Sequence, residues 1–513
     1  MSESRVKKSL LNAKVNLIFY VLTLFLSFFS RKIFLDCLGA DFVGLTGTLM
    51  TFLGFLNLAE MGIGSAVAFA LYKPLADGNK TEIIDIVSVL GFLYKRIGII
   101  VSILVITGMF FLPCFFAKEN VEIGVVLAVY IVFSVSSLTG YFFNYKQILL
   151  NADQRGYVVT AYTQGCSLLK MILQLLVVLH WRNYYAWCGI ELLFCIFYTF
   201  LFNKRINSVY PWLSSSVLIG EKVYPGYKRV VTMAKQIFLH RLAVVIQWQS
   251  APILICSFAS LHAVAMYGNY TIVVDKLTQL LNNALESTGA AVGNLIATCE
   301  ESRVLAIFWE LMSFRIWIAN CIVACVYTLI DPFIVLWLGD TYVLSRGILI
   351  VMLLNVFLTI IGAGIGQFLS GSGLYKDIWA PIVQIVVVIL CSCLFGWKYG
   401  LFGVLLGTLI GHVLITVGWK PCFLFMYRFK LNPVLFFWGI MWRIASVFIA
   451  ILAAYVASDL CGGFVSNKSW AGWLCSACIN SCLVFGLALL SLYVMDYSFR
   501  SFLHKLVRAY NKK

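Results

Sequence analysis

The chain has 513 residues, of which 62% are hydrophobic and only 12% are charged, and its mean hydropathy is +0.93. Soluble proteins carry about 25% charged residues, so this composition excludes a water-soluble enzyme with a single membrane anchor. The net charge of +16 would suit nucleic acid if it formed one patch. The basic residues lie mostly between apolar segments, however, so we expect no nucleic-acid partner.

Apolar stretches long enough to cross about 30 Å of hydrocarbon as helices recur along the whole chain. The sequence therefore predicts an all-α polytopic membrane protein with about fourteen transmembrane helices. The basic start of the chain resembles that of a signal peptide, but no small-residue cleavage site follows, which favours a retained first span. The predicted spans are 15–35, 42–71, 97–117, 121–143, 158–179, 184–203, 236–258, 264–285, 311–338, 346–370, 378–396, 400–427, 434–457 and 470–495.

The distribution of lysine and arginine predicts the orientation in the membrane. With the N-terminus inside, most of the 38 basic residues fall on the cytoplasmic side, and the opposite loops hold only Lys118, Arg182, Lys398 and Lys468. This asymmetry follows the positive-inside rule. We therefore expect both termini in the cytoplasm.

The sequence also repeats itself with a period of about 220 residues. Residues 43–47 resemble residues 264–268, Arg96 corresponds to Arg315, and Gln147 corresponds to Gln367. Such a period holds six spans, which predicts two parallel six-helix lobes with a cavity between them and transport by alternating access. We predict an N-lobe at 1–208, a C-lobe at 209–430, and two extra helices with a basic tail at 431–513.

Catalytic motifs are absent from the sequence, so we expect neither an enzyme nor a cofactor. The sixteen cysteines lie mostly within apolar segments at helical spacing, which indicates small packing residues rather than metal ligands or disulfides. The loop at 73–96 contains an apolar-periodic stretch, Ile83 to Leu93, for which we expect an interfacial helix at the cytoplasmic surface.

Basic residues inside predicted spans are the candidate substrate ligands, because charge is costly in hydrocarbon unless it meets a partner or water. Lys170 lies about 18 Å into the fifth span at 1.5 Å per residue, and Lys276 lies at a similar depth in the eighth. Arg31 is near the outer end of the first span, and Arg241 is near the start of the seventh. Together they predict a cationic cavity for an anionic ligand such as pyrophosphate.

Each of these residues also has a structural interpretation. Glu60, Glu191 and Asp275 are the acidic candidates for ion coupling or charge pairing, and Glu191 and Asp275 could simply neutralise the deep lysines. Arg31 could anchor the first helix at the interface, and Arg241 could extend to the cytoplasmic headgroups. We expect Arg315 and Arg443 to extend to those headgroups as well.

Glycine and proline indicate where helices pack closely or bend. A face of glycines in the twelfth span predicts close helix packing, and the glycine-rich tenth span predicts local bending. Pro252 interrupts the seventh span after a run of polar residues, which predicts a hinge. The glycines are Gly403, Gly407 and Gly411 in the twelfth span, and Gly362, Gly364 and Gly366 in the tenth.

Six short segments are distinctive beyond their hydropathy. They are residues 38–44, 59–65 and 71–75 in the first half, and residues 267–270, 336–339 and 400–408 in the second. In these segments the chain resembles bacterial polysaccharide flippases of the multidrug/oligosaccharidyl-lipid/polysaccharide exporter superfamily. The resemblance extends from about residue 10 to residue 430.

The resemblance implies a flippase for undecaprenyl-pyrophosphate-linked oligosaccharides, the repeat units of O-antigen or capsule, in the bacterial inner membrane. It assigns Arg31 to the cationic cavity, whereas Lys170, Lys276 and Arg241 are inferred from depth alone. Many relatives carry an aspartate in the seventh helix where this chain has Gln249 to Pro252, so ion coupling through that acid is in doubt. The partners would be the lipid-linked oligosaccharide, membrane lipids, a polysaccharide polymerase and glycosyltransferases. The alternatives are a multidrug antiporter of organic cations and a peptidoglycan-precursor flippase.

Overall fold

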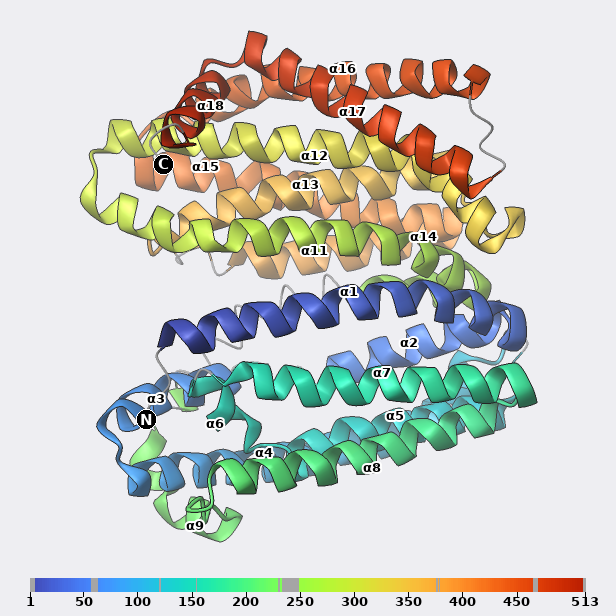
Figure 1. Cartoon of the computed structure of the whole chain (residues 1–513), viewed down its shortest axis with the longest axis vertical. Helices are drawn as coiled ribbons and strands as arrows, with labels where there is room; N and C mark the ends of the chain where they lie inside the picture. Colours follow the sequence, from blue (N-terminus) through green and yellow to red (C-terminus); the bar gives the residue numbers. More distant parts are fainter. Residues whose placement is uncertain are drawn as a thin grey trace. The chain divides into compact units, whose positions relative to one another are not determined.

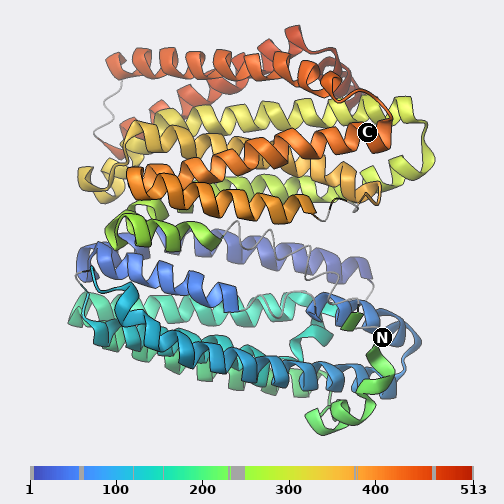
Figure 2. The same cartoon turned by 180° about the vertical axis from the view of Figure 1, so that it is seen from behind.

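The protein is described here by a computed structural model covering residues 5–56, 63–119, 121–153, 155–228, 231–232, 249–374, 377, 379–464 and 469–510. Throughout these ranges the regular structure is helical, without a strand. Figures 1 and 2 show long helices packed side by side within each half of the chain. This confirms the predicted all-α fold.

Ten helices within the described ranges are long and apolar enough to span a membrane. They include α1 (Arg5–Leu38), α4 (Lys80–Phe115), α5 (Ile123–Phe142), α7 (Gly156–Trp181), α8 (Tyr184–Val209), α12 (Glu301–Leu338), α13 (Arg346–Gly371), α16 (Val434–Phe464) and α17 (Trp470–Met495). The tenth, Trp379–Phe429, is made of α14 (Trp379–Gly411), η4 (His412–Trp419), α15 (Lys420–Leu424) and η5 (Phe425–Phe429). It covers both the eleventh and the twelfth predicted span, because the chain folds back within α14 at Gly400.

The remaining predicted spans correspond to shorter or more polar helices. The second is divided between α2 (Ala40–Leu56) and α3 (Ile63–Asp77), and the eighth lies in α11 (Leu261–Thr298). The described part of the seventh is the helix Gln249–Phe258. The described part of the chain also contains the shorter helices α6 (Gln147–Ala152), α9 (Val217–Val223), η2 (Tyr224–Tyr227), η3 (Asp340–Tyr342) and α18 (Tyr497–Tyr510).

The chain divides into two compact units, Met1–Ala265 and Met266–Lys513. In the first unit, α1 packs on α7, α7 on α8, α8 on α5, and α5 on α2, so that these helices follow one another around the unit. In the second, α12 contacts α13, α16, α17 and α18. The lobe boundaries predicted at residues 208 and 430 stay predictions.

The prediction of an interfacial helix at Ile83–Leu93 is wrong. These residues form the start of α4, which continues without interruption to Phe115 after the Asn79 side chain caps its first turn. Ile83, Val87 and Leu90 are buried in a cluster with residues of α3, α6 and the chain that follows α8. An apolar stripe of this kind suits a tertiary contact as well as a membrane surface, so its periodicity alone could not distinguish the two.

The internal repeat has counterparts in the helices themselves. Helices α4 and α12 are both unusually long, with 36 and 38 residues, and each contains a proline near its C-terminal end, Pro113 and Pro332. These prolines are as far apart as Arg96 and Arg315. The two arginines nevertheless differ in their surroundings, because Arg96 is exposed while Arg315 is buried.

The close packing predicted for the glycine face is confirmed. At Gly400 the backbone has a φ of 56°, and the chain folds back so that the two halves of α14 pack on each other. A side chain on Gly403 would place its Cβ 2.0 Å from the Phe395 carbonyl oxygen, and one on Gly407 would lie 2.3 Å from the Ser392 nitrogen. Gly362 and Gly364 similarly make room for Thr416 and for Arg315.

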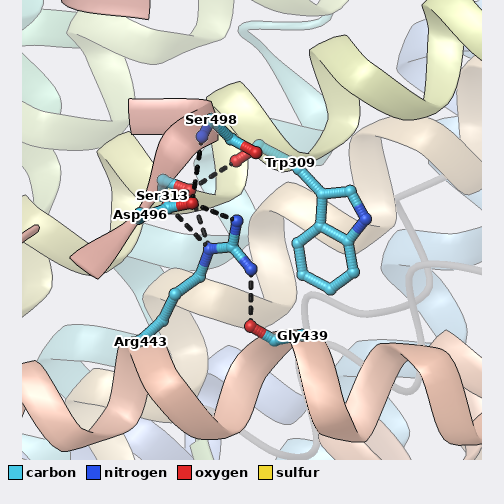
Figure 3. A network of polar contacts seen from close by, with 6 residues as sticks. All are labelled: Trp309, Ser313, Gly439, Arg443, Asp496 and Ser498. Atoms are coloured by element: carbon cyan, nitrogen blue, oxygen red, sulfur yellow. Dashed lines mark hydrogen bonds and ion pairs between the residues drawn. The ribbon is translucent and has the colours of Figure 1, made fainter. Parts of the chain in front are cut away.

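The prediction that Arg315 and Arg443 extend to the headgroups is wrong, because both side chains are buried, with 3% and 7% exposure. Arg315 donates to Gln367 Oε1 at 2.9 Å. Arg443 forms a bidentate ion pair with Asp496, with Nη2 to Oδ1 at 2.7 Å and Nε to Oδ2 at 2.9 Å (Figure 3). Partners within the second unit thus satisfy the hydrogen-bonding groups of two arginines that hydropathy alone would place at the headgroups.

The Arg443 network connects the C-terminal helices to α12. Arg443 on α16 also donates to Ser313 Oγ at 2.8 Å and lies over the Trp309 ring at 4.4 Å, and both residues belong to α12 (Figure 3). Asp496 accepts from the Ser498 backbone nitrogen at 3.1 Å and so caps α18. One buried carboxylate therefore joins α12, α16 and the α17–α18 junction.

Candidate functional site

The predicted lysine at mid-span, Lys170, lies in a polar site within the first unit. Its Nζ atom lies 2.6 Å from Glu191 Oε1, and Gln174 Nε2 donates to Glu191 Oε2 at 3.0 Å. Lys170 and Gln174 are four residues apart on α7 and so share one face of the helix. The chain then turns at Arg182, which has a φ of 46°, and Asn183 caps the start of α8. This tight turn makes α7 and α8 neighbours and brings Glu191 to the two α7 side chains.

The ion pair is largely shielded, because the side chain of Glu191 is 8% exposed and that of Lys170 is 24% exposed. This arrangement corresponds to the charge-pairing alternative that the sequence left open. Removing either partner alone would leave a buried charge, which typically costs about 3–5 kcal/mol. The pair therefore stabilises the α7–α8 contact as well as placing an ammonium group at this depth.

A cavity of about 310 Å³ adjoins the ion pair. It is formed by helices α5, α7 and α8 together with Gln147 at the start of α6. Most of its side chains carry hydroxyl, amide or thiol groups, and Phe194 and Tyr198 contribute aromatic rings. Its residues are Ser136, Thr139, Gly140, Asn144, Gln147, Thr163, Cys166, Ser167, Lys170, Glu191, Phe194, Cys195 and Tyr198. We call this cavity the α5–α7–α8 pocket.

The pocket extends along the helices from the ion pair towards the predicted cytoplasmic end. Asn144 and Gln147 follow the end of α5, and Thr163 lies two turns before Lys170 on α7. Burial lowers the pKa of the neighbouring Lys146, in the loop between α5 and α6. Hydroxyl and amide groups can donate and accept hydrogen bonds, so this lining suits a hydroxylated ligand with an anionic group near Lys170.

Arg31, which is half-buried on α1, lies apart from this pocket. Its Nη2 atom donates to the Ala265 carbonyl oxygen at 2.9 Å. Nearby in the chain, the Leu261 nitrogen donates to Glu119 Oε2 at 3.2 Å. Within the first unit, Arg31 therefore contacts the start of α11, and both its interpretation as an interface anchor and its proposed role in the substrate cavity stay predictions.

The other predicted site residues are not part of the α5–α7–α8 pocket or lie outside the described residues. On α11, Lys276 is half-buried and Asp275 is exposed. Glu60 and Arg241 lie outside the described residues. Pro252 lies in the helix Gln249–Phe258, whose preceding residues are also outside the described ranges, so its role as a hinge stays a prediction. No group of His, Cys, Asp or Glu side chains suited to a metal ion occurs in the described part of the chain.

Sequence reasoning missed Gln174 and the polar lining contributed by α5. The spacing between Lys170 and Gln174 is a signal that could have identified Gln174. Thr139 gave no such signal, because an isolated polar residue in an apolar helix more often bonds to its own backbone. Asn144 gave none because it lies just after the end of α5. Their place in the pocket depends on how α5 packs against α8.

Neither a family model nor a curated protein matches this chain. Among solved structures, it resembles the lipid II flippase MurJ in an inward closed conformation, with a TM-score of 0.64 and 16% identity over 94% of this chain and 99% of that chain. It also resembles an inward-facing multidrug resistance MATE transporter of the MOP superfamily, with a TM-score of 0.56 and 17% identity over 84% of this chain and 94% of that one. A third match is a point mutant of the Vibrio cholerae MATE transporter VcmN, with a TM-score of 0.50 and 14% identity over 81% and 96%. The chain therefore has the fold shared by these membrane transporters.

Proposed function

We propose that the chain is a flippase that moves undecaprenyl-pyrophosphate-linked oligosaccharides, the repeat units of O-antigen or capsule, across the bacterial inner membrane. The α5–α7–α8 pocket is the observation that carries this proposal. It combines an ammonium group, which can bind phosphate as a point charge, with hydroxyl and amide groups suited to sugar. The prenyl tail would remain in the lipid, and both termini of the protein would lie in the cytoplasm.

The arrangement of charge in the pocket favours an anionic substrate over a cationic drug. An organic cation would need a carboxylate free to pair with it, whereas Glu191 already accepts from Lys170 and Gln174. A pyrophosphate could instead compete with Glu191 for Lys170. Arg31, Arg241 and Lys276 would contribute further positive charge along the path, and Glu60 and Asp275 would serve in pairing or ion coupling.

Two alternatives share the fold. A peptidoglycan-precursor flippase is supported by the match to MurJ, which covers more of this chain than either MATE transporter does. A multidrug antiporter is supported by the MATE matches alone. We favour the polysaccharide substrate because the sequence segments quoted above resemble that group, and we expect a polymerase and glycosyltransferases to act on the same pathway.

Deletion of the gene tests the proposal directly. Mass spectrometry of prenyl-linked oligosaccharides should show accumulated intact repeat units, while a surface-polysaccharide stain should show a bare cell surface. The strain must lack a second flippase. Lysis with accumulated peptidoglycan precursor would instead establish the first alternative, and unchanged lipid-linked pools with lost export of organic cations would establish the second.

Point variants then connect the function to the pocket. Expression of Lys170→Gln together with Glu191→Gln in the deletion strain should fail to restore surface polysaccharide, since the pocket keeps its neutral polar lining but loses the ammonium group. A matched control is Lys204→Gln, which removes an exposed charge at the end of α8. Restoration by the control and not by the double variant would support the proposal. Full restoration by a stably expressed double variant would refute the role of Lys170.

A further inference from the structure

Helix α18 and the residues that follow it carry basic side chains but no acidic ones. From Tyr497 to Lys513 the sequence contains three arginine or lysine residues within α18 and two after it, with no aspartate or glutamate. The helix begins two residues after Met495, where the apolar helix α17 ends. The basic segment therefore starts at the predicted cytoplasmic boundary of the membrane.

One face of α18 is already occupied by contacts with α12. Phe499 is fully buried, and its ring lies 6.0 Å from that of Trp317, while the Phe502 ring lies 5.0 Å from that of Phe314. Ser501 Oγ and Lys505 Nζ donate to Glu310 Oε1 at 2.8 and 2.7 Å. Because these contacts hold the start of the helix in place, the position of Arg500 on it is defined.

Asp496 reinforces this placement. Its carboxylate pairs with Arg443 and accepts from the Ser498 nitrogen (Figure 3). Both of its oxygens are thus engaged by groups other than the side chain of Arg500, which follows one turn later. Asp496, the acidic residue nearest to Arg500 in the sequence, therefore already has other hydrogen-bonding partners.

The guanidinium group of Arg500 contains a buried hydrogen-bond donor without an acceptor among the described residues. Its side chain is half-buried, and its Nε atom is buried without a hydrogen-bonding partner. Among the described residues, neither an ion pair nor a hydrogen bond engages its guanidinium group. An unpaired buried donor on a charged group costs free energy unless an external acceptor satisfies it. His504, one turn further along the same face, is exposed.

We propose that Arg500 and His504 form a binding site for the phosphate headgroup of an anionic phospholipid in the cytoplasmic leaflet. A guanidinium group matches the geometry of phosphate oxygens, and the adjoining basic tail attracts a negatively charged membrane surface. The bound lipid would lie against the junction that Asp496 makes between α12, α16 and α18. Lys505 contributes charge at the edge of the site while remaining bonded to Glu310.

Lipid binding to the full-length protein tests this proposal independently of any transport. The purified chain in detergent is titrated with phosphatidylglycerol or phosphatidylcholine, and bound lipid is counted by native mass spectrometry. Wild type should prefer phosphatidylglycerol. Removing Arg500 by Arg500→Gln should weaken that preference about fivefold, the effect of one basic residue near an anionic surface, and Arg500→Gln/His504→Gln should weaken it at least as much.

Matched variants separate the site from general charge effects. Lys204→Gln/Arg205→Gln removes two exposed charges from the end of α8 and should leave phosphatidylglycerol binding within about twofold of wild type. Arg500→Lys should retain part of the preference. Because Arg500 has no partner among the described residues, Arg500→Gln should not lower the unfolding temperature, so a loss of lipid binding would be a defect of a folded protein.

Three outcomes would overturn the proposal. The first is unchanged lipid preference in the Arg500→Gln/His504→Gln variant. The second is an equal loss in the Lys204→Gln/Arg205→Gln control, which would indicate nonspecific attraction. The third is displacement of phosphatidylglycerol by inorganic phosphate, which would identify a site for a soluble anion rather than for a lipid.

Discussion

The ion pair between Lys170 and Glu191 allows the stabilising role of a charge to be separated from its transport role. Lys170→Gln and Glu191→Gln each leave one charge in a largely shielded site, whereas the double variant leaves none. At 2.6 Å and an effective dielectric constant of about 20, the attraction is about 6 kcal/mol. Desolvation of the two ions offsets several kcal/mol of this.

We therefore expect each single variant to lower the free energy of unfolding by about 3 kcal/mol, and the double variant to lower it by about 1 kcal/mol. The measurement is a double-mutant cycle from unfolding in mixed micelles, followed by circular dichroism. Lys204→Gln provides the control and should remain within about 0.5 kcal/mol of wild type. The same four proteins are then assayed for surface polysaccharide in the deletion strain.

The two measurements distinguish three situations. A coupling energy of about 2 kcal/mol or more with loss of transport in the stable double variant would support both roles. If the single variants are no less stable than the double variant, the ion-pair argument is refuted. Normal transport by the double variant would restrict Lys170 to a structural role.

Further predictions concern the C-terminal network, the glycine contacts and Arg31. Asp496→Asn should lower the free energy of unfolding by about 3 kcal/mol, because Arg443 would lose its buried counterion; a pulse-proteolysis assay should show faster cleavage near α18, and unchanged cleavage would contradict the role of the junction. Gly403→Ala should prevent stable folding, because its Cβ would lie 2.0 Å from a backbone oxygen, whereas Gly366→Ala has open space around it and should express normally in detergent-extracted membranes. Gly364→Ala should cost about 1–3 kcal/mol, since the nearest atoms belong to the side chains of Arg315 and Met312; a cost as large as that of Gly403→Ala would refute the distinction between side-chain and backbone contacts. Arg31→Gln should reduce surface polysaccharide without loss of expression if the guanidinium binds substrate, and normal polysaccharide with a lower unfolding temperature would assign it to anchoring alone.

Much of the fold follows from local sequence properties. Hydropathy over about 20 residues identifies a segment that can cross a membrane, and apart from a few terminal positions (116–117, 121–122 and 143) the described residues of the predicted spans are helical. The close packing of Gly403 and Gly407 was also predictable, because glycines four residues apart must share a helix face. Lys170 and Glu191 could be recognised as candidates because a deep charge requires a partner or water.

Tertiary structure decided which partner each charged group has. Hydropathy places Arg443 inside the predicted span 434–457 without indicating its partner, yet Asp496, more than fifty positions later, pairs with it within the second unit. The apolar stripe at Ile83–Leu93 likewise gave no sign that other helices, rather than lipid, would cover it. The α5–α7–α8 pocket arises only when three helices are packed together. Helix formation depends on neighbours in sequence, whereas the energy of a buried charge depends on neighbours in space, and the second set is assembled only by folding.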